Sequence, residues 1–110
     1  MPLAPVNARV VTVTATSMTI DWDPNPNSNV SGYVLEWTTN TLTKRTSIRN
    51  SQFQINGMLA GREYTINIYS RNKDNARSTT STSVVGSTCE TLNLQPYNYI
   101  LNLSNIKQDQ

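Results

Sequence analysis

The segment 17–37, SMTIDWDPNPNSNVSGYVLEW, decides the fold. Its large apolar residues stand at every second position in two runs, which are Met18, Ile20, Trp22 and Tyr33, Leu35, Trp37. Alternation of this kind is the pattern of strands that bury one face. Between the two runs, residues 23–31 are rich in proline and asparagine, which favour loops. The segment therefore predicts two β-strands joined by a loop.

The same alternation extends over the rest of the chain, and turn-forming residues recur at the spacing of short antiparallel strands. We expect seven strands, near residues 6–14, 17–23, 31–39, 43–49, 52–56, 62–72 and 79–88. The alternation assigns the following residues to the buried face: Ala8, Val10, Val13, Met18, Ile20, Trp22, Tyr33, Leu35, Trp37, Phe53, Ile55, Met58, Tyr64, Ile66 and Ile68. Polar residues fill most positions between them, which predicts an all-β sandwich of two sheets.

The amino-acid composition excludes several classes of function. A chain of 110 residues fits one small domain. It contains no His and a single Cys, which excludes histidine-based catalysis and a Cys/His zinc site. Because the chain also lacks a phosphate-binding motif and a paired set of acidic residues, we expect no enzyme activity, no metal and no cofactor. The net charge is +2 and the basic residues are scattered, so we expect no nucleic-acid partner. No apolar run is long enough to insert into a membrane.

Segment 17–37 resembles the second and third strands of the fibronectin type III family. The resemblance consists of a buried tryptophan at Trp22, a proline-rich loop, and the pair Gly32 and Tyr33 at the start of the next strand. This family folds as a seven-stranded antiparallel immunoglobulin-like β-sandwich. The resemblance implies the same fold here, with Tyr33 and Trp37 among the residues that build its core.

A second stretch, INGMLAGREYTINIYSRN, is similar to the tyrosine corner of this family, usually Leu-x-Pro-Gly-x-x-Tyr. Met58, Gly61 and Tyr64 take the leucine, glycine and tyrosine places, whereas Ala60 replaces the proline. We expect the Tyr64 hydroxyl to bond a backbone group upstream of it. The resemblance covers residues 5–91, which leaves residues 1–4 as a linker and residues 92–110 as a C-terminal extension.

The resemblance implies a non-catalytic extracellular module that acts as a spacer and protein-interaction unit in a cell-adhesion or receptor-like protein. Its partners would be other proteins, neighbouring domains of the same chain, or second copies of itself. An accessory module of a secreted carbohydrate-active enzyme is the alternative. Bacterial linker modules tend to lack cysteine and have no use for glycosylation sequons, so Cys89 and the sequon at Asn29 favour the first interpretation.

Two sequons, at Asn29 and Asn102, are candidates for N-glycosylation. Asn29 falls in the expected loop between the second and third strands, where a glycan is tolerated. The lone Cys89 stands at the end of the last strand. Two interpretations stay open for it: an inert thiol, or, in a secreted protein, a disulfide to a partner outside this chain.

Three basic residues, Arg49, Lys73 and Arg77, fall in loops that gather at one end of a type III sandwich. One interpretation is a small basic spot for an acidic partner or a heparin-like glycan, and the other is ordinary solubilising loops.

The tail beyond Thr91 departs from the family pattern. Its large apolar residues again stand at every second position, at Tyr97, Tyr99, Leu101 and Leu103. This alternation predicts an added strand over residues 96–104, packed on this domain, on a second copy or on a following domain. A frayed terminus is the alternative.

Overall fold

The computed structural model describes residues 2–40 and 42–90. Its strands are β1 (Val6–Val13), β2 (Met18–Asp23), β3 (Gly32–Thr39), β4 (Leu42–Ile48), β5 (Gln52–Ile55), β6 (Glu63–Arg71) and β7 (Thr82–Ser87). These bounds lie within a few residues of those expected from the sequence. No helix that could cross a membrane occurs in the described part of the chain.

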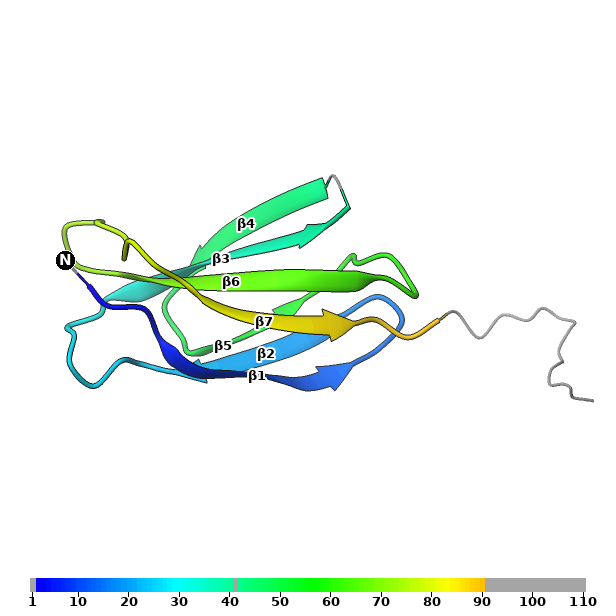
Figure 1. The fold of residues 1–110 in the computed structure, drawn as a ribbon, viewed down its shortest axis with the longest axis horizontal. Helices are drawn as coiled ribbons and strands as arrows, with labels where there is room; N and C mark the ends of the chain where they lie inside the picture. The colour runs from blue at the N-terminus through cyan, green and yellow to red at the C-terminus, as the bar shows by residue number, and fades with distance from the viewer. Residues whose placement is uncertain (1, 41, 91–110) are drawn as a thin grey trace, which may run out of the picture.

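The strands form two antiparallel sheets that pack face to face (Figure 1). One sheet has three strands in the order β1-β2-β5, and the other has four in the order β4-β3-β6-β7. Neighbouring strands in both sheets run antiparallel. The predicted seven-stranded immunoglobulin-like β-sandwich is therefore confirmed.

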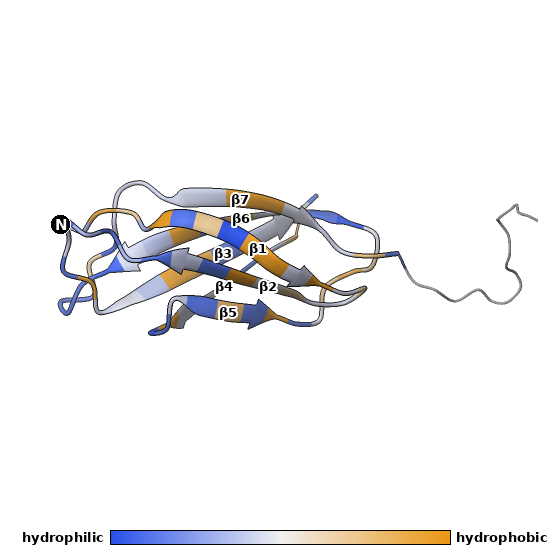
Figure 2. Ribbon diagram, turned by 90° about the horizontal axis from the view of Figure 1, so that it is seen from below, coloured by the Kyte–Doolittle hydropathy of each residue, from blue (hydrophilic) through white to orange (hydrophobic). Residues whose placement is uncertain are grey.

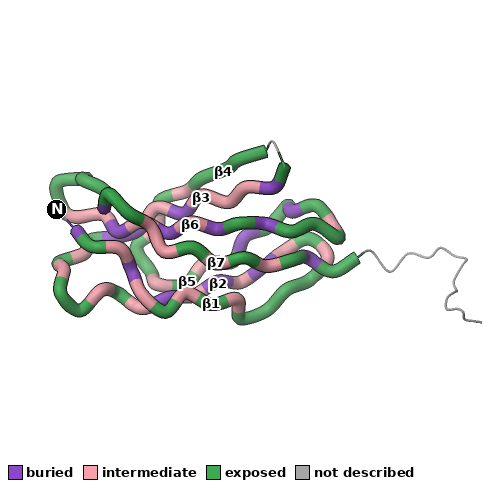
Figure 3. The backbone as a smooth tube through the Cα atoms, viewed as in Figure 1, coloured by how far each residue is buried: buried purple, intermediate pink, exposed green. Residues whose placement is uncertain are grey.

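The core lies between the sheets and is built from alternate residues of β2, β3 and β6, as the buried positions in Figure 3 show. Figure 2 shows apolar and polar segments alternating along the front strand, β1. At the centre, the Trp22 and Tyr33 rings meet edge to face with centroids 5.2 Å apart. The predicted buried face is confirmed for Met18, Ile20, Trp22, Tyr33, Leu35, Ile55, Met58, Tyr64, Ile66 and Ile68, with Ala8, Val10, Trp37 and Phe53 partly buried against it.

The predicted burial of Val13 is wrong, because this residue is 37% exposed. The register shift between Val10 and Thr12 places Val13 opposite the buried Met18, so the two side chains share one face of the sheet. Val13 is, however, the last residue of β1, an edge strand, and it lies outside the core.

A second irregularity in β1 lies between Val6 and Arg9, where Asn7 adopts a positive φ of 58°. Asparagine tolerates this left-handed conformation better than other residues with a side chain. The Asn7 side-chain amide donates a hydrogen bond to Asp23 of β2 across 3.0 Å. This hydrogen bond, together with the nearby Arg9 guanidinium, holds the pKa of the Asp23 carboxyl below its usual value. This irregularity therefore links the start of β1 to the end of β2 through side-chain contacts.

Residues 2–4, expected to be a linker, pack on the loop between β2 and β3. Pro2 is buried, and the Leu3 amide donates to the Ser28 hydroxyl across 2.9 Å. The Asn25 side-chain amide donates to the Ala4 carbonyl, also across 2.9 Å. Leu3 and Ala4 are therefore hydrogen-bonded to the β2–β3 loop ahead of β1.

Candidate interaction surfaces

The two residues after β7 are fixed where the described chain leaves the sandwich, at the pole opposite its N-terminal entry (Figure 1). The amide of Thr88 donates to the Arg62 carbonyl across 2.9 Å, and that of Cys89 donates to the Thr14 carbonyl across 3.0 Å. In return, the Gly61 amide donates to the Cys89 carbonyl across 2.9 Å. The exit segment, residues 88–89, is thereby bonded to the β1–β2 turn on one side and to the β5–β6 crossing on the other.

The tyrosine corner lies at the same pole and is hydrogen-bonded to the exit segment. The Leu59 amide donates to the Tyr64 hydroxyl across 2.8 Å, which is the upstream backbone bond expected from the sequence. The buried Thr88 hydroxyl donates to the Leu59 carbonyl across 2.6 Å. The Arg62 amide in turn donates to this hydroxyl across 3.1 Å. Leu59 is held from both sides, so the corner and the exit segment form one hydrogen-bonded unit.

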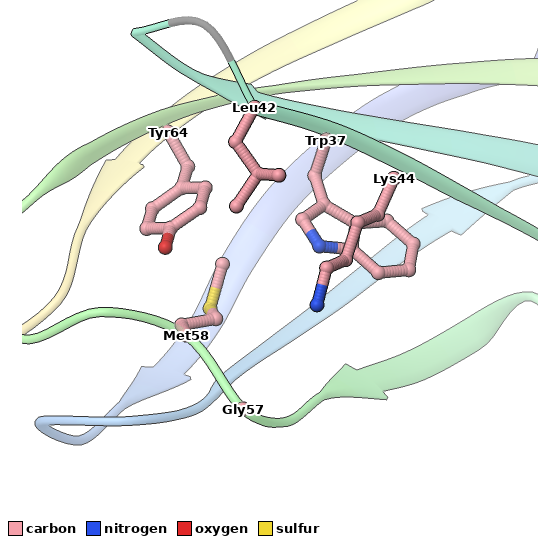
Figure 4. A pocket seen from close by; sticks show the side chains of 6 residues that line it. All are labelled: Trp37, Leu42, Lys44, Gly57, Met58 and Tyr64. Atoms are coloured by element: carbon pink, nitrogen blue, oxygen red, sulfur yellow. The ribbon is translucent and has the colours of Figure 1, made fainter.

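A small pocket lies beside the corner, lined by Trp37, Leu42, Lys44, Gly57, Met58 and Tyr64 (Figure 4). Its volume of about 10 Å³ leaves room for no more than one water molecule. The described residues also contain no group of three or more His, Cys, Asp or Glu side chains placed to hold a metal ion.

The opposite pole carries the candidate glycosylation site. Asn29 is exposed in the β2–β3 loop and lines an open depression together with Pro2 and Lys73. Figure 1 shows the β2–β3 and β6–β7 loops at this pole, and both contribute residues to the depression. Arg49 is exposed just after β4, at the start of the β4–β5 loop.

Arg77 does not stand among the loop tips. The β6–β7 loop folds back so that Arg77 pairs with Arg71, and its guanidinium carbon lies 4.2 Å from the centroid of the Tyr69 ring. One of its nitrogens lies 3.6 Å from a carboxylate oxygen of Glu36 on β3. The structure therefore assigns Arg77 to the outer face of the four-stranded sheet rather than to the basic spot expected with Arg49 and Lys73.

Cys89 carries an exposed free thiol in the exit segment. The second sequon, at Asn102, and the predicted strand at Tyr97, Tyr99, Leu101 and Leu103 lie outside the described residues. A partner for the thiol and a surface for this strand remain predictions.

The family model of the fibronectin type III domain matches residues 3–86. The third fibronectin III domain of the human KIAA0343 protein aligns with a TM-score of 0.70 and 23% identity, covering 83% of this chain and 86% of that one. The FN5 domain of Drosophila Lar aligns at 0.69 and 15% identity, covering 83% of this chain and all (100%) of that one. A myokine structure aligns at 0.72 and 19% identity, covering 82% and 100% of the two chains. No curated protein matches the sequence.

The match over residues 3–86 shows that the chain belongs to the fibronectin type III family. Domains of this family are generally non-catalytic modules of multidomain proteins, where they contact other proteins, and they are common in extracellular proteins. The structural likenesses, all below 25% identity, show the fold.

Proposed function

We propose that this domain is an extracellular spacer and protein-interaction module of a cell-adhesion or receptor-like multidomain protein. The observation that carries the proposal is the exit segment. The described chain enters at one pole and leaves at the other, and Thr88 and Cys89 are bonded on both sides where it leaves. A module built in this way sets the direction and the distance of whatever follows it in the chain.

The fixed exit segment distinguishes a rigid spacer from a domain that is joined to its neighbour by a flexible linker. A connecting segment without backbone bonds to the domain samples many directions and transmits no defined geometry. Here the Thr88 hydroxyl adds bonds to Leu59 and Arg62 in a buried setting, so the residues before Glu90 move with the sandwich. The neighbour in the chain would then be carried at a set angle.

Asn29 supports the extracellular part of the proposal, because its side chain is exposed at the entry pole, away from the exit segment. A glycan there would project into solvent without disturbing either sheet. We expect the protein isolated from its natural source to carry an N-linked glycan on Asn29. Peptide-N-glycosidase treatment followed by mass spectrometry of the peptide that contains Asn29 measures this directly.

The matched control is Ser31→Ala, which removes the sequon and keeps the asparagine. In the natural host this variant should lose the glycan at Asn29 and leave the melting temperature of the enzymatically deglycosylated domain unchanged. A natural protein that bears no glycan at Asn29 would count against an extracellular eukaryotic module and favour an accessory domain of a microbial enzyme.

A further inference from the structure

The outer face of the four-stranded sheet gathers arginines around one tyrosine. We call this surface the arginine face; it consists of Glu36, Arg45, Tyr69, Arg71 and Arg77. Cross-strand register places Glu36 of β3 opposite Arg45 of β4. Arg71 of β6 is opposite Gly32, where a Cβ would lie only 3.1 Å from the Arg71 guanidinium carbon. Three strands and one folded-back loop therefore place these side chains on one face of the sheet.

Glu36 forms ion pairs with two of the arginines, Arg45 and Arg77. An Arg45 nitrogen lies 2.7 Å from the same Glu36 oxygen that Arg77 approaches to 3.6 Å. The Glu36 side chain is only 15% exposed, whereas those of Arg45 and Arg77 are 66% and 45% exposed. The carboxylate is covered by its two partners, and the guanidinium groups face solvent.

The face has unused hydrogen-bonding capacity. Each guanidinium carries five N–H donors in a fixed fork, and one carboxylate oxygen occupies only a small part of them. With three arginines and one glutamate, the formal charge of the face is 3 − 1 = +2. Arg77 is also held in place by its stacking on Tyr69. Preoriented guanidinium forks of this kind bind carboxylates in strong, charge-assisted pairs.

We propose that the arginine face binds an acidic segment of another protein. Arginine and tyrosine are the residue types that most often dominate the energetics of protein–protein interfaces. The same sheet face also presents Val85, which is 54% exposed and would contact apolar parts of the partner. The partner would place Asp or Glu side chains against the free donors of Arg45 and Arg77.

Two other occupants fit less well. A second copy that presents the same face would bring two positive surfaces together, and like charges in contact oppose association. A sulfated polysaccharide is a dense polyanion that is best matched by a strongly positive surface, whereas the formal charge of this face is only +2. A protein segment that carries its acidic side chains singly matches this small net charge better.

This inference deepens the proposed function by naming the surface and the chemistry of the partner. The experiment is a titration of the isotopically labelled full chain with a peptide of alternating glutamate and glycine, followed by amide chemical shifts. A peptide with glutamine in place of glutamate is the neutral control, and a heparin oligosaccharide is the competing probe. We expect shifts concentrated at Glu36, Tyr69 and Arg77, no shifts with the neutral peptide, and weaker binding of heparin.

The double variant Arg45→Gln/Arg77→Gln should weaken binding of the acidic peptide by about tenfold or more, since it removes two charge-assisted contacts. Arg49→Gln/Lys73→Gln removes the same charge from the loops and should change binding by less than about twofold, a residual long-range effect. Equal weakening by both double variants would overturn the proposal, because net charge alone would then explain the binding. Absence of peptide binding, or tighter binding of heparin at the same residues, would overturn it as well. None of these results would alter the glycan at Asn29 or the fixed exit segment, on which the proposed function rests.

Discussion

Replacing Trp22 by alanine should lower the free energy of unfolding by about 3–5 kcal/mol. The Trp22 side chain is 1% exposed and contacts the Tyr33 ring edge to face, so its removal leaves a cavity where the two sheets meet. Small domains are stable by about 5–15 kcal/mol in total, and the variant should therefore be marginal. Equilibrium unfolding in urea, monitored by far-ultraviolet circular dichroism, measures the loss.

Trp37→Ala is the matched control, because it removes the same side chain from a partly buried position near Phe53. Its free energy of unfolding should fall by clearly less than that of Trp22→Ala, since a partly exposed indole buries less apolar area in the folded domain. Equal losses for the two variants would mean that Trp22 is not the centre of the core, and the register assigned to β2 would be wrong.

Gly32→Ala should destabilise the domain by about 1–3 kcal/mol, the usual cost of forcing atoms into a packed site. A Cβ at this position would lie 2.8 Å from the backbone carbonyl oxygen of Ile48. That oxygen belongs to β4, where Ile48 pairs with Tyr33, so it cannot retreat without disturbing the ladder. The midpoint of thermal or urea unfolding reports the effect.

Gly86→Ala tests the reason for this loss. A Cβ at Gly86 would lie 2.9 Å from the Met18 sulfur, near the end of a flexible side chain rather than the backbone. Methionine adapts to such changes, so this variant should be less destabilised than Gly32→Ala. The reverse order would show that the backbone of β4 yields more easily than the core around Met18.

The sandwich could be predicted from the sequence because the patterns that specify its strands and turns lie within short segments of the chain. Strands that bury one face repeat at period two, and the turns between them are marked by residues such as Gly57 and Gly61, both of which adopt positive φ angles. The Tyr64 corner was predictable for the same reason, since its spacing from Gly61 is short and fixed. The burial of Val13 was wrongly predicted because alternation indicates which face a residue belongs to, and not how far the other sheet covers the end of an edge strand.

The surfaces were less predictable. Arg77 stands 41 positions from Glu36 in the sequence, and only the folded-back β6–β7 loop brings the two together. Loop charges have no periodicity from which such a contact could be deduced. The packing of Pro2 and Leu3 on the β2–β3 loop likewise depends on single hydrogen bonds between distant residues. The scaffold was therefore predictable from local sequence patterns, whereas the arginine face depends on contacts between residues far apart in the sequence.

Amide hydrogen exchange of the exit segment most directly tests the proposal that the domain acts as a rigid spacer. If the segment moves with the sandwich, the amides of Gly61, Thr88 and Cys89 should exchange as slowly as that of Ile66 in the central strand β6, because each donates a backbone bond at the pole. The amide of Lys73, in an exposed loop, is the internal reference for fast exchange. Exchange of Thr88 and Cys89 at the rate of Lys73, while Ile66 stays protected, would show a flexible exit and contradict the spacer.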